Sequence, residues 1–267
     1  MKGLLFGSIA LALIAGPAIA ADMPVKAAPA PVYSWTGLYF GINGGAAWGS
    51  FDTGLFASNG TPPFFFTGNI PGVNAAGAHS FTNSSWLAGA QIGYVYQNNS
   101  PVVFGFEVAF DGMDLHGAAT NSQLYLSAVP NNGFTVSENV STKWLLTFLA
   151  RIGYDTGGGW VPYVTGGVAV ADFKHSFNYI DTFFAPNCPC AASFSTVAGA
   201  PAIGAGLEWR VVHQWSFRAE FVYMNFSTFT TGNSKVGNPA TGTIANLEHR
   251  AALQESIARA LISYKLY

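Results

Sequence analysis

Apolar and polar residues alternate along eight stretches of the chain, the period-two pattern of β-strands that face an apolar environment on one side. In residues 36–48, Leu38 and Phe40 fall on one face, whereas Tyr39 and Asn43 fall on the other. The second face carries small or polar residues, which suits the interior of a narrow barrel. The same alternation predicts further strands at residues 86–97, from residue 102, at 143–154, 160–171, 202–210 and 215–225, and at about 257–266.

The connections between these strands differ in length in a regular way. Tight turns at residues 98–100, 155–159 and 211–214 alternate with long polar stretches at 49–84, 112–141, 174–196 and 227–253. Outer-membrane barrels have short turns on the periplasmic side and longer loops outside. The predicted fold class is therefore all-β, an eight-stranded antiparallel up-and-down transmembrane β-barrel with short periplasmic turns and long extracellular loops.

Charged residues in the middle of the predicted strands fall on the face opposite the aromatic residues. Slipping a strand by one residue would turn its charges toward lipid, at a cost of roughly 2–4 kcal/mol for each Arg or Lys near the midplane. An eight-stranded barrel is only wide enough for its own side chains, so we expect these charges to fill the lumen as ion pairs. The inward candidates are Glu107, Asp111, Lys143, Arg151, Glu208, Arg218, Glu220, Arg259 and Lys265.

The end of the chain fits the strand pattern least well. Residues 246–261 mix charges with alanine and leucine, a composition that by propensity also suits a helix. We expect a strand at about 257–266, because closure of the barrel requires an even strand count and leaves no exposed edge. The machinery that inserts such barrels generally recognises an outward aromatic residue at the C-terminus. Here the alternation puts Leu266 outward and leaves Tyr267 one residue beyond.

Composition supports a membrane environment. Half of the residues are apolar and only 9% are charged, against about 25% in soluble globular domains. After the N-terminal stretch no run of about 20 apolar residues could form a spanning helix, and a closed barrel is the other permitted way to cross a bilayer. The net charge of −2 leaves no basic patch that would indicate nucleic-acid binding.

The N-terminus has the features of a secretory signal. Lys2 precedes an apolar stretch at residues 4–15, and Ala18-Ile19-Ala20 forms a small-x-small cleavage site. We expect residues 1–20 to be a cleaved signal peptide, residues 21–34 to be an Ala/Pro-rich periplasmic segment, and residues 35–267 to be the barrel domain. An exported protein can carry a disulfide between Cys188 and Cys190, although so short a ring would strain the bond.

Several short motifs strengthen this interpretation by their order and spacing. They are Ala21-Asp22-Met23-Pro24, Trp35-Thr36-Gly37-Leu38-Tyr39, Gln91-Ile92-Gly93-Tyr94, Arg151-Ile152-Gly153-Tyr154, Tyr163-Val164-Thr165-Gly166-Gly167-Val168-Ala169 and Gly204-Ala205-Gly206-Leu207-Glu208-Trp209. In these motifs the chain resembles the small outer-membrane barrel proteins of alphaproteobacteria, the outer-membrane immunogenic or "porin family" proteins with an OmpA-like eight-stranded barrel.

The resemblance implies an abundant protein of the cell outer membrane that contributes to envelope integrity and exposes variable loops. It supplies no catalytic residues and no cofactor. The implied partners are outer-membrane lipids and lipopolysaccharide, with the barrel-assembly machinery and periplasmic chaperones during biogenesis. A structural envelope role with a filled lumen is the first functional hypothesis, and a narrow channel for ions or small solutes is the second.

A third hypothesis is surface binding of a ligand such as haem, or of a host, through the long loops. The aromatic run at residues 62–66 would be either an exposed binding patch or a group of rings folded back on the barrel rim. The five histidines lie mostly in the predicted loops, so we expect them to be solvated and predict no metal site.

An enzymatic role is disfavoured by the spacing of histidine and serine. Barrels that deacylate lipid A resemble hydrolases with a His-x-Ser pair on one strand face, where the imidazole can activate the hydroxyl. Here His79-Ser80 and His175-Ser176 are adjacent, so in extended chain their side chains point to opposite faces.

Overall fold

The computed structural model describes residues 34–126, 131–183, 190–212 and 214–266. The predicted signal peptide, residues 21–33 of the following segment, Cys188 and Tyr267 lie outside the described residues. Residues 35–267 make up one compact unit. Among the described residues, no helix is long and apolar enough to cross a membrane.

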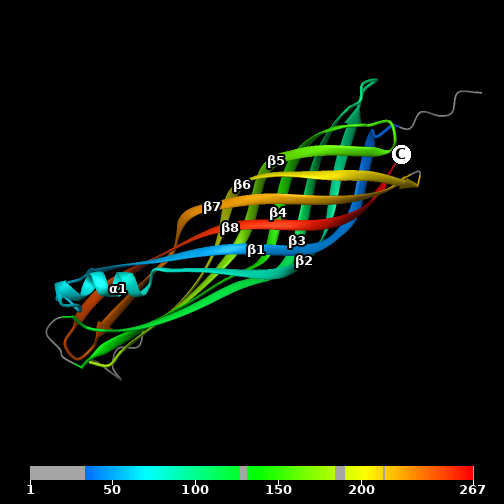
Figure 1. Ribbon diagram of the computed structural model, residues 1–267. Helices are drawn as coiled ribbons and strands as arrows, with labels where there is room; N and C mark the ends of the chain where they lie inside the picture. Colours follow the sequence, from blue (N-terminus) through cyan, green and yellow to red (C-terminus); the bar gives the residue numbers. More distant parts are fainter. Residues whose placement is uncertain (1–33, 127–130, 184–189, 213, 267) are drawn as a thin grey trace, which may run out of the picture. The chain divides into compact units, whose positions relative to one another are not determined.

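Eight antiparallel strands close into a barrel in which each strand pairs with its neighbours in sequence and β8 pairs with β1 (Figure 1). This arrangement confirms the predicted fold class, and the end of the chain is a strand, not a helix. The strands are β1 (Gly37–Asn59), β2 (His79–Gln97), β3 (Val102–Leu124), β4 (Gly133–Tyr154), β5 (Trp160–Asp181), β6 (Cys190–Val212), β7 (Trp215–Asn238) and β8 (Thr243–Lys265).

The strands are longer than the sequence pattern predicted. Each has 19 to 24 residues, about twice the 9–11 that a tilted strand needs to cross a bilayer. Much of each predicted long loop is therefore strand, and these loop boundaries were wrong. At the end of the barrel opposite the tight turns, the connections are residues 60–78, 125–132, 182–189 and 239–242. The first of these carries the 3-10 helix η1 (Thr67–Asn69) and the short helix α1 (Ile70–Ala76).

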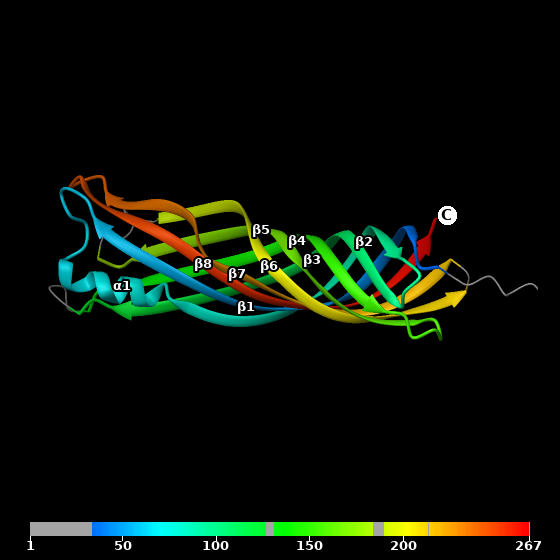
Figure 2. The ribbon, with the colours of Figure 1, turned by 90° about the horizontal axis from the view of Figure 1, so that it is seen from above.

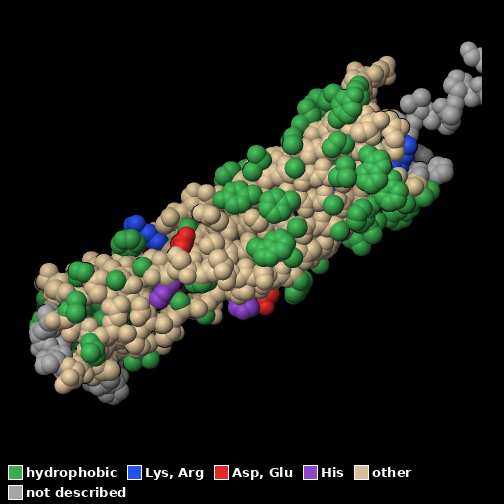
Figure 3. Space-filling view, in the orientation of Figure 1, with side chains coloured by type: hydrophobic (Ala, Val, Ile, Leu, Met, Phe, Trp, Pro, Cys, Tyr) green, Lys and Arg blue, Asp and Glu red, His purple; other side chains and the backbone are tan. Residues whose placement is uncertain are grey.

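Part-way along the strands the apolar side chains change from the outward face to the inward face. On β1, Phe40 points outward and Asn43 inward, as lipid outside and a polar lumen require. Farther along the same strand, with the alternation unbroken, Asp52 is exposed while Phe51 and Leu55 are buried. The second half of β1 therefore has the pattern of a water-soluble barrel. Figure 3 shows hydrophobic side chains gathered over the part of the barrel near the end of β8 and sparser beyond it.

We call the half of each strand next to the tight turns the apolar band and assign it to the membrane. It spans about 11 residues per strand, as a bilayer-crossing strand requires. Aromatic side chains lie at both of its edges, which is typical of outer-membrane barrels. The remainder of each strand, on the side away from the tight turns, is called the outer extension. The apolar band comprises residues 38–48, 86–96, 102–112, 144–154, 160–170, 199–209, 215–225 and 256–266.

Apolar side chains fill the middle of the barrel. All eight strands contribute to one cluster of buried residues, among them Leu87, Leu149 and Ile257, none of them more than 6% exposed. A second cluster fills the end of the outer extension, where α1 lies (Figure 2). Phe64 and Phe65 are buried in this second cluster, so these two rings fold back on the barrel as one of the two interpretations expected.

The prediction that Lys143 faces the lumen is wrong. A β-bulge shifts the register between Ser141 and Leu145, so that Thr142 is buried and Lys143 is exposed. The backbone N–H groups of Lys143 and Trp144 both donate to Oδ1 of Asp172 on β5, at 2.8 and 2.9 Å. The Asp172 carboxylate therefore satisfies two amides that the bulge removes from the strand ladder.

Substituting Asp172 with alanine should lower the free energy of unfolding by about 1–3 kcal/mol, because the bulge amides lose their acceptor. Urea unfolding in lipid vesicles, followed by tryptophan fluorescence, measures this loss. Asp114→Ala is the matched control: Asp114 is exposed on β3, and its removal should cost less than about 0.5 kcal/mol. Equal losses for the two variants would refute the role of Asp172.

Candidate functional site

Charged side chains meet inside the part of the barrel surrounded by the apolar band. Of the nine lumen candidates, Lys143 is exposed and Lys265 is partly exposed at the end of β8. The other seven are buried, with no side chain more than 7% exposed, and come from β3, β4, β6, β7 and β8: Glu107, Asp111, Arg151, Glu208, Arg218, Glu220 and Arg259.

Arg259 is the centre of this network. Its Nη1 donates to Asp111 Oδ2 at 2.9 Å, and its Nε and Nη2 donate to Glu220 Oε1 at 2.9 and 2.7 Å. A longer contact of 3.4 Å joins Nη2 to Glu107 Oε1. Glu107 also accepts a hydrogen bond from Arg218. One guanidinium therefore joins three carboxylates from β3 and β7.

A second ion pair lies beside this centre. Arg151 Nη1 donates to Glu208 Oε2 at 2.7 Å, and Ser216 Oγ donates to the other carboxylate oxygen at 2.7 Å. The Arg151 guanidinium lies 5.3 Å from the ring centroids of both Tyr39 and Tyr163, within cation–π range. The two tyrosines thus connect the ion pair to the Arg259 centre.

The tyrosines also complete the hydrogen bonding of the carboxylates. Tyr39 donates to Glu107 Oε2 at 2.6 Å, and Tyr163 donates to Glu220 Oε2 at 2.8 Å. Glycines face both hydroxyls and leave room for them. A Cβ at Gly93, for example, would come within 2.3 Å of the Tyr39 oxygen. The alternation of residues 36–48 predicted that Tyr39 points inward, but neither tyrosine was predicted to be a partner of the network. Their inward parity on β1 and β5 was the available signal.

A second buried polar cluster lies in the outer extension. Glu138, His175 and His249 face inward from β4, β5 and β8, and none is more than 2% exposed. The expectation that the histidines are solvated is therefore wrong for these two. His116 is exposed on β3, and His213 lies outside the described residues.

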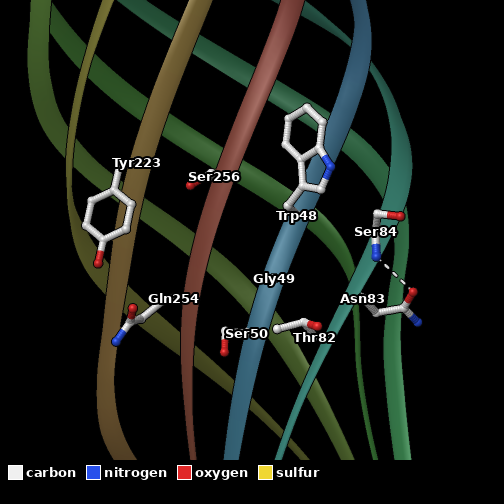
Figure 4. A pocket seen from close by; sticks show the side chains of 9 residues that line it. All are labelled: Trp48, Gly49, Ser50, Thr82, Asn83, Ser84, Tyr223, Gln254 and Ser256. Carbon is white, nitrogen blue, oxygen red and sulfur yellow. Dashed lines mark hydrogen bonds between the residues drawn. The ribbon is translucent and has the colours of Figure 1, made fainter.

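A groove of about 490 Å³ lies on the outer surface, across β7, β8, β1 and β2 (Figure 4). The Trp48 and Tyr223 rings flank it at the outer edge of the apolar band. The other side chains that line it are small or polar and uncharged: Ser50, Thr82, Asn83, Ser84, Gln254 and Ser256.

Comparisons with known proteins agree with this architecture. The chain matches the family described as outer membrane protein beta-barrel domain over residues 8–242. It is 31% identical over 229 residues to the 31 kDa outer-membrane immunogenic protein of Brucella melitensis, covering 84% of this chain and 86% of the relative. The protein of the same name from Brucella suis matches with the same values.

Similar solved structures have low sequence identity to this chain. The outer membrane protease OmpT from Escherichia coli covers 86% of this chain and 97% of its own, with 9% identity and a TM-score of 0.46. The outer membrane protein OprG from Pseudomonas aeruginosa has the same coverage, 11% identity and a TM-score of 0.36. From the family match and the Brucella relatives, the chain belongs to the outer membrane β-barrel protein family and is a protein of the cell outer membrane.

Proposed function

We propose that this protein is a closed structural barrel of the outer membrane, whose lumen is filled and whose outer extension carries its surface. The observation that carries the proposal is the apolar cluster contributed by all eight strands, in which no residue is more than 6% exposed. Moving a charged group into such an environment without a partner is very costly. An ion would have to cross this layer to pass through the lumen.

The charged network around Arg259, which lies inside the apolar band, supports the same function. Buried arginines and carboxylates that already contact one another at 2.7–2.9 Å leave few groups to replace the hydration shell of a passing ion. Ion pairs across the lumen also join distant strands, since Arg259 on β8 contacts Asp111 on β3. The network therefore stiffens the barrel. A narrow channel is the alternative function, and it requires both the network and the apolar layer to rearrange.

No catalytic activity is part of this proposal. His175 points into the barrel while Ser176 is exposed on the outside, so the imidazole cannot activate the adjacent hydroxyl. His79 and Ser80 likewise alternate on β2, with Ser80 exposed. These placements support the separation of faces that the sequence predicted for the two pairs.

Planar-bilayer recording tests the proposal directly. The purified protein, shown to be folded by its heat-modifiable gel mobility, should produce no stable conductance steps, because the apolar layer excludes ions. An open porin added to the same bilayer is the positive control for the recording. Reproducible steps whose size increases with salt concentration would contradict a closed lumen and favour the channel.

A further inference from the structure

Three potential metal ligands converge inside the outer extension, above the apolar layer. Glu138 on β4, His175 on β5 and His249 on β8 each offer an atom, and these atoms all lie within 4.8 Å of one another. His175 Nε2 lies 3.9 Å from Glu138 Oε1. Ligands at 2.0–2.1 Å around a tetrahedral zinc ion are separated by about 3.3 Å, so side-chain adjustments of about 1 Å would complete the geometry.

Each of the three side chains in this cluster has a polar atom without a hydrogen-bond partner. Glu138 Oε1 and Oε2, His175 Nε2 and His249 Nδ1 are buried without a hydrogen bond among the described residues. Thr53 lies beside the carboxylate, but its hydroxyl donates to the Gly77 carbonyl at 3.3 Å. A polar group that is buried without a hydrogen bond destabilises the fold. One cation between them would satisfy all three side chains together.

The second nitrogen of each imidazole already has a hydrogen-bond partner. His175 Nδ1 lies 2.8 Å from Thr231 Oγ1, and His249 Nε2 lies 2.8 Å from Ser234 Oγ, both hydroxyls being on β7. Metal-binding histidines in proteins almost always use their second nitrogen in this way, which orients the ring and fixes the tautomer. In this cluster these hydrogen bonds leave His175 Nε2 and His249 Nδ1 as the nitrogens available to a metal ion.

Two phenylalanine rings pack against His249, and all three side chains of the cluster are buried. The Phe177 ring centroid is 4.3 Å and that of Phe194 5.3 Å from the His249 ring. Burial lowers the pKa of His175 to about 4 and that of His249 to about 3, and it raises the pKa of Glu138 to about 7. Both imidazoles are therefore uncharged at neutral pH, and the 3.9 Å approach to Glu138 is not an ion pair there.

We propose that Glu138, His175 and His249 bind one divalent transition-metal ion of the zinc type inside the outer extension. Two imidazoles and one carboxylate form a donor set suited to zinc and its neighbours, whereas calcium and magnesium take oxygen ligands. The ion joins β4, β5 and β8 across the barrel and stabilises the outer extension. This site is independent of whether the lumen conducts.

Metal titration of the folded full-length protein tests the proposal. A tag-free, chelator-treated preparation should bind one equivalent of zinc by calorimetry, and cobalt should give the visible absorption of a low-symmetry nitrogen and oxygen site. Glu138→Gln, His175→Gln and His249→Gln keep side-chain size and should each weaken zinc binding by at least about tenfold. His116→Gln is the control, because His116 is an exposed histidine outside the cluster.

Two outcomes would overturn the proposal. One is that the folded wild-type protein binds no zinc and gives no cobalt spectrum. The other is that zinc affinity is unchanged in the three cluster variants, whatever happens in His116→Gln. If these variants do not fold, Ser234→Ala keeps all three ligands, removes the hydrogen bond to His249 and a weak 3.8 Å contact from Cys190 Sγ, and should still weaken zinc binding. Unchanged zinc affinity in a folded Ser234→Ala protein would then count against the site.

Discussion

Replacing Arg259 with methionine should lower the free energy of unfolding by about 3–5 kcal/mol, the cost typical of removing one partner from a buried ion pair. The guanidinium contacts Glu107, Asp111 and Glu220, and its side chain is fully buried. Methionine has a similar length but no charge, so the three carboxylates would remain in the lumen without their shared partner. Urea unfolding of the protein in lipid vesicles measures the loss.

Two further variants separate charge from packing. Arg250→Met removes an arginine from the same strand, but Arg250 is 41% exposed and forms a surface pair with Glu248, so the expected change is less than about 1 kcal/mol. Adding Glu220→Gln to Arg259→Met removes one of the orphaned charges and should restore part of the stability. Unfolding of Arg259→Met at the wild-type urea concentration would show that the network does not stabilise the barrel.

The sequence pattern predicted the part of the barrel that lies in lipid well. On β7, Arg218 and Glu220 alternate with Phe217 and Phe221, and the structure buries the first two and exposes the others. Lipid explains this success, because a bilayer accepts only apolar side chains on the outward face. The local alternation was therefore enough to assign inside and outside without knowledge of the neighbouring strands.

The sequence pattern did not predict the outer extension, because a strand in water has its polar residues outward and its apolar residues inward. On β8, Arg259 is buried and Ile262 exposed within the apolar band, whereas Leu253 is buried and Gln254 exposed beyond it. The period of two continues without interruption while the apolar face changes side. Polar outward residues were therefore interpreted as loops, and the charges and alanines of this stretch suggested a helix.

Three residues, Lys143, His175 and His249, depended on information that local alternation does not contain. Lys143 changes face because of a bulge whose amides bind Asp172, a residue of the next strand. His175 and His249 are separated in the sequence and meet only when β5 and β8 close around the same interior. Counting the inward parity of β8 from Arg259 through Leu253 would have placed His249 inside.

The assignment of the apolar band can be tested with two arginine substitutions on the outward face of β3. Phe106 is 52% exposed near the middle of the band, and Ala118 is exposed on the outer extension of the same strand. Phe106→Arg should lower the free energy of unfolding in lipid vesicles by about 2–4 kcal/mol, because the charge would enter the hydrocarbon near the midplane. Ala118→Arg should change it by less than about 0.5 kcal/mol, because the side chain reaches water.

The pair distinguishes a partly immersed barrel from one that lipid surrounds along its whole length. Both substitutions add the same charge to the same strand and face, so the difference between them reports the surrounding solvent. If Ala118→Arg cost as much as Phe106→Arg, lipid would cover the outer extension and the exchange of polarity would need another cause. If only Phe106→Arg destabilises, the outer extension lies in water, and its apolar interior folds as that of a soluble barrel does.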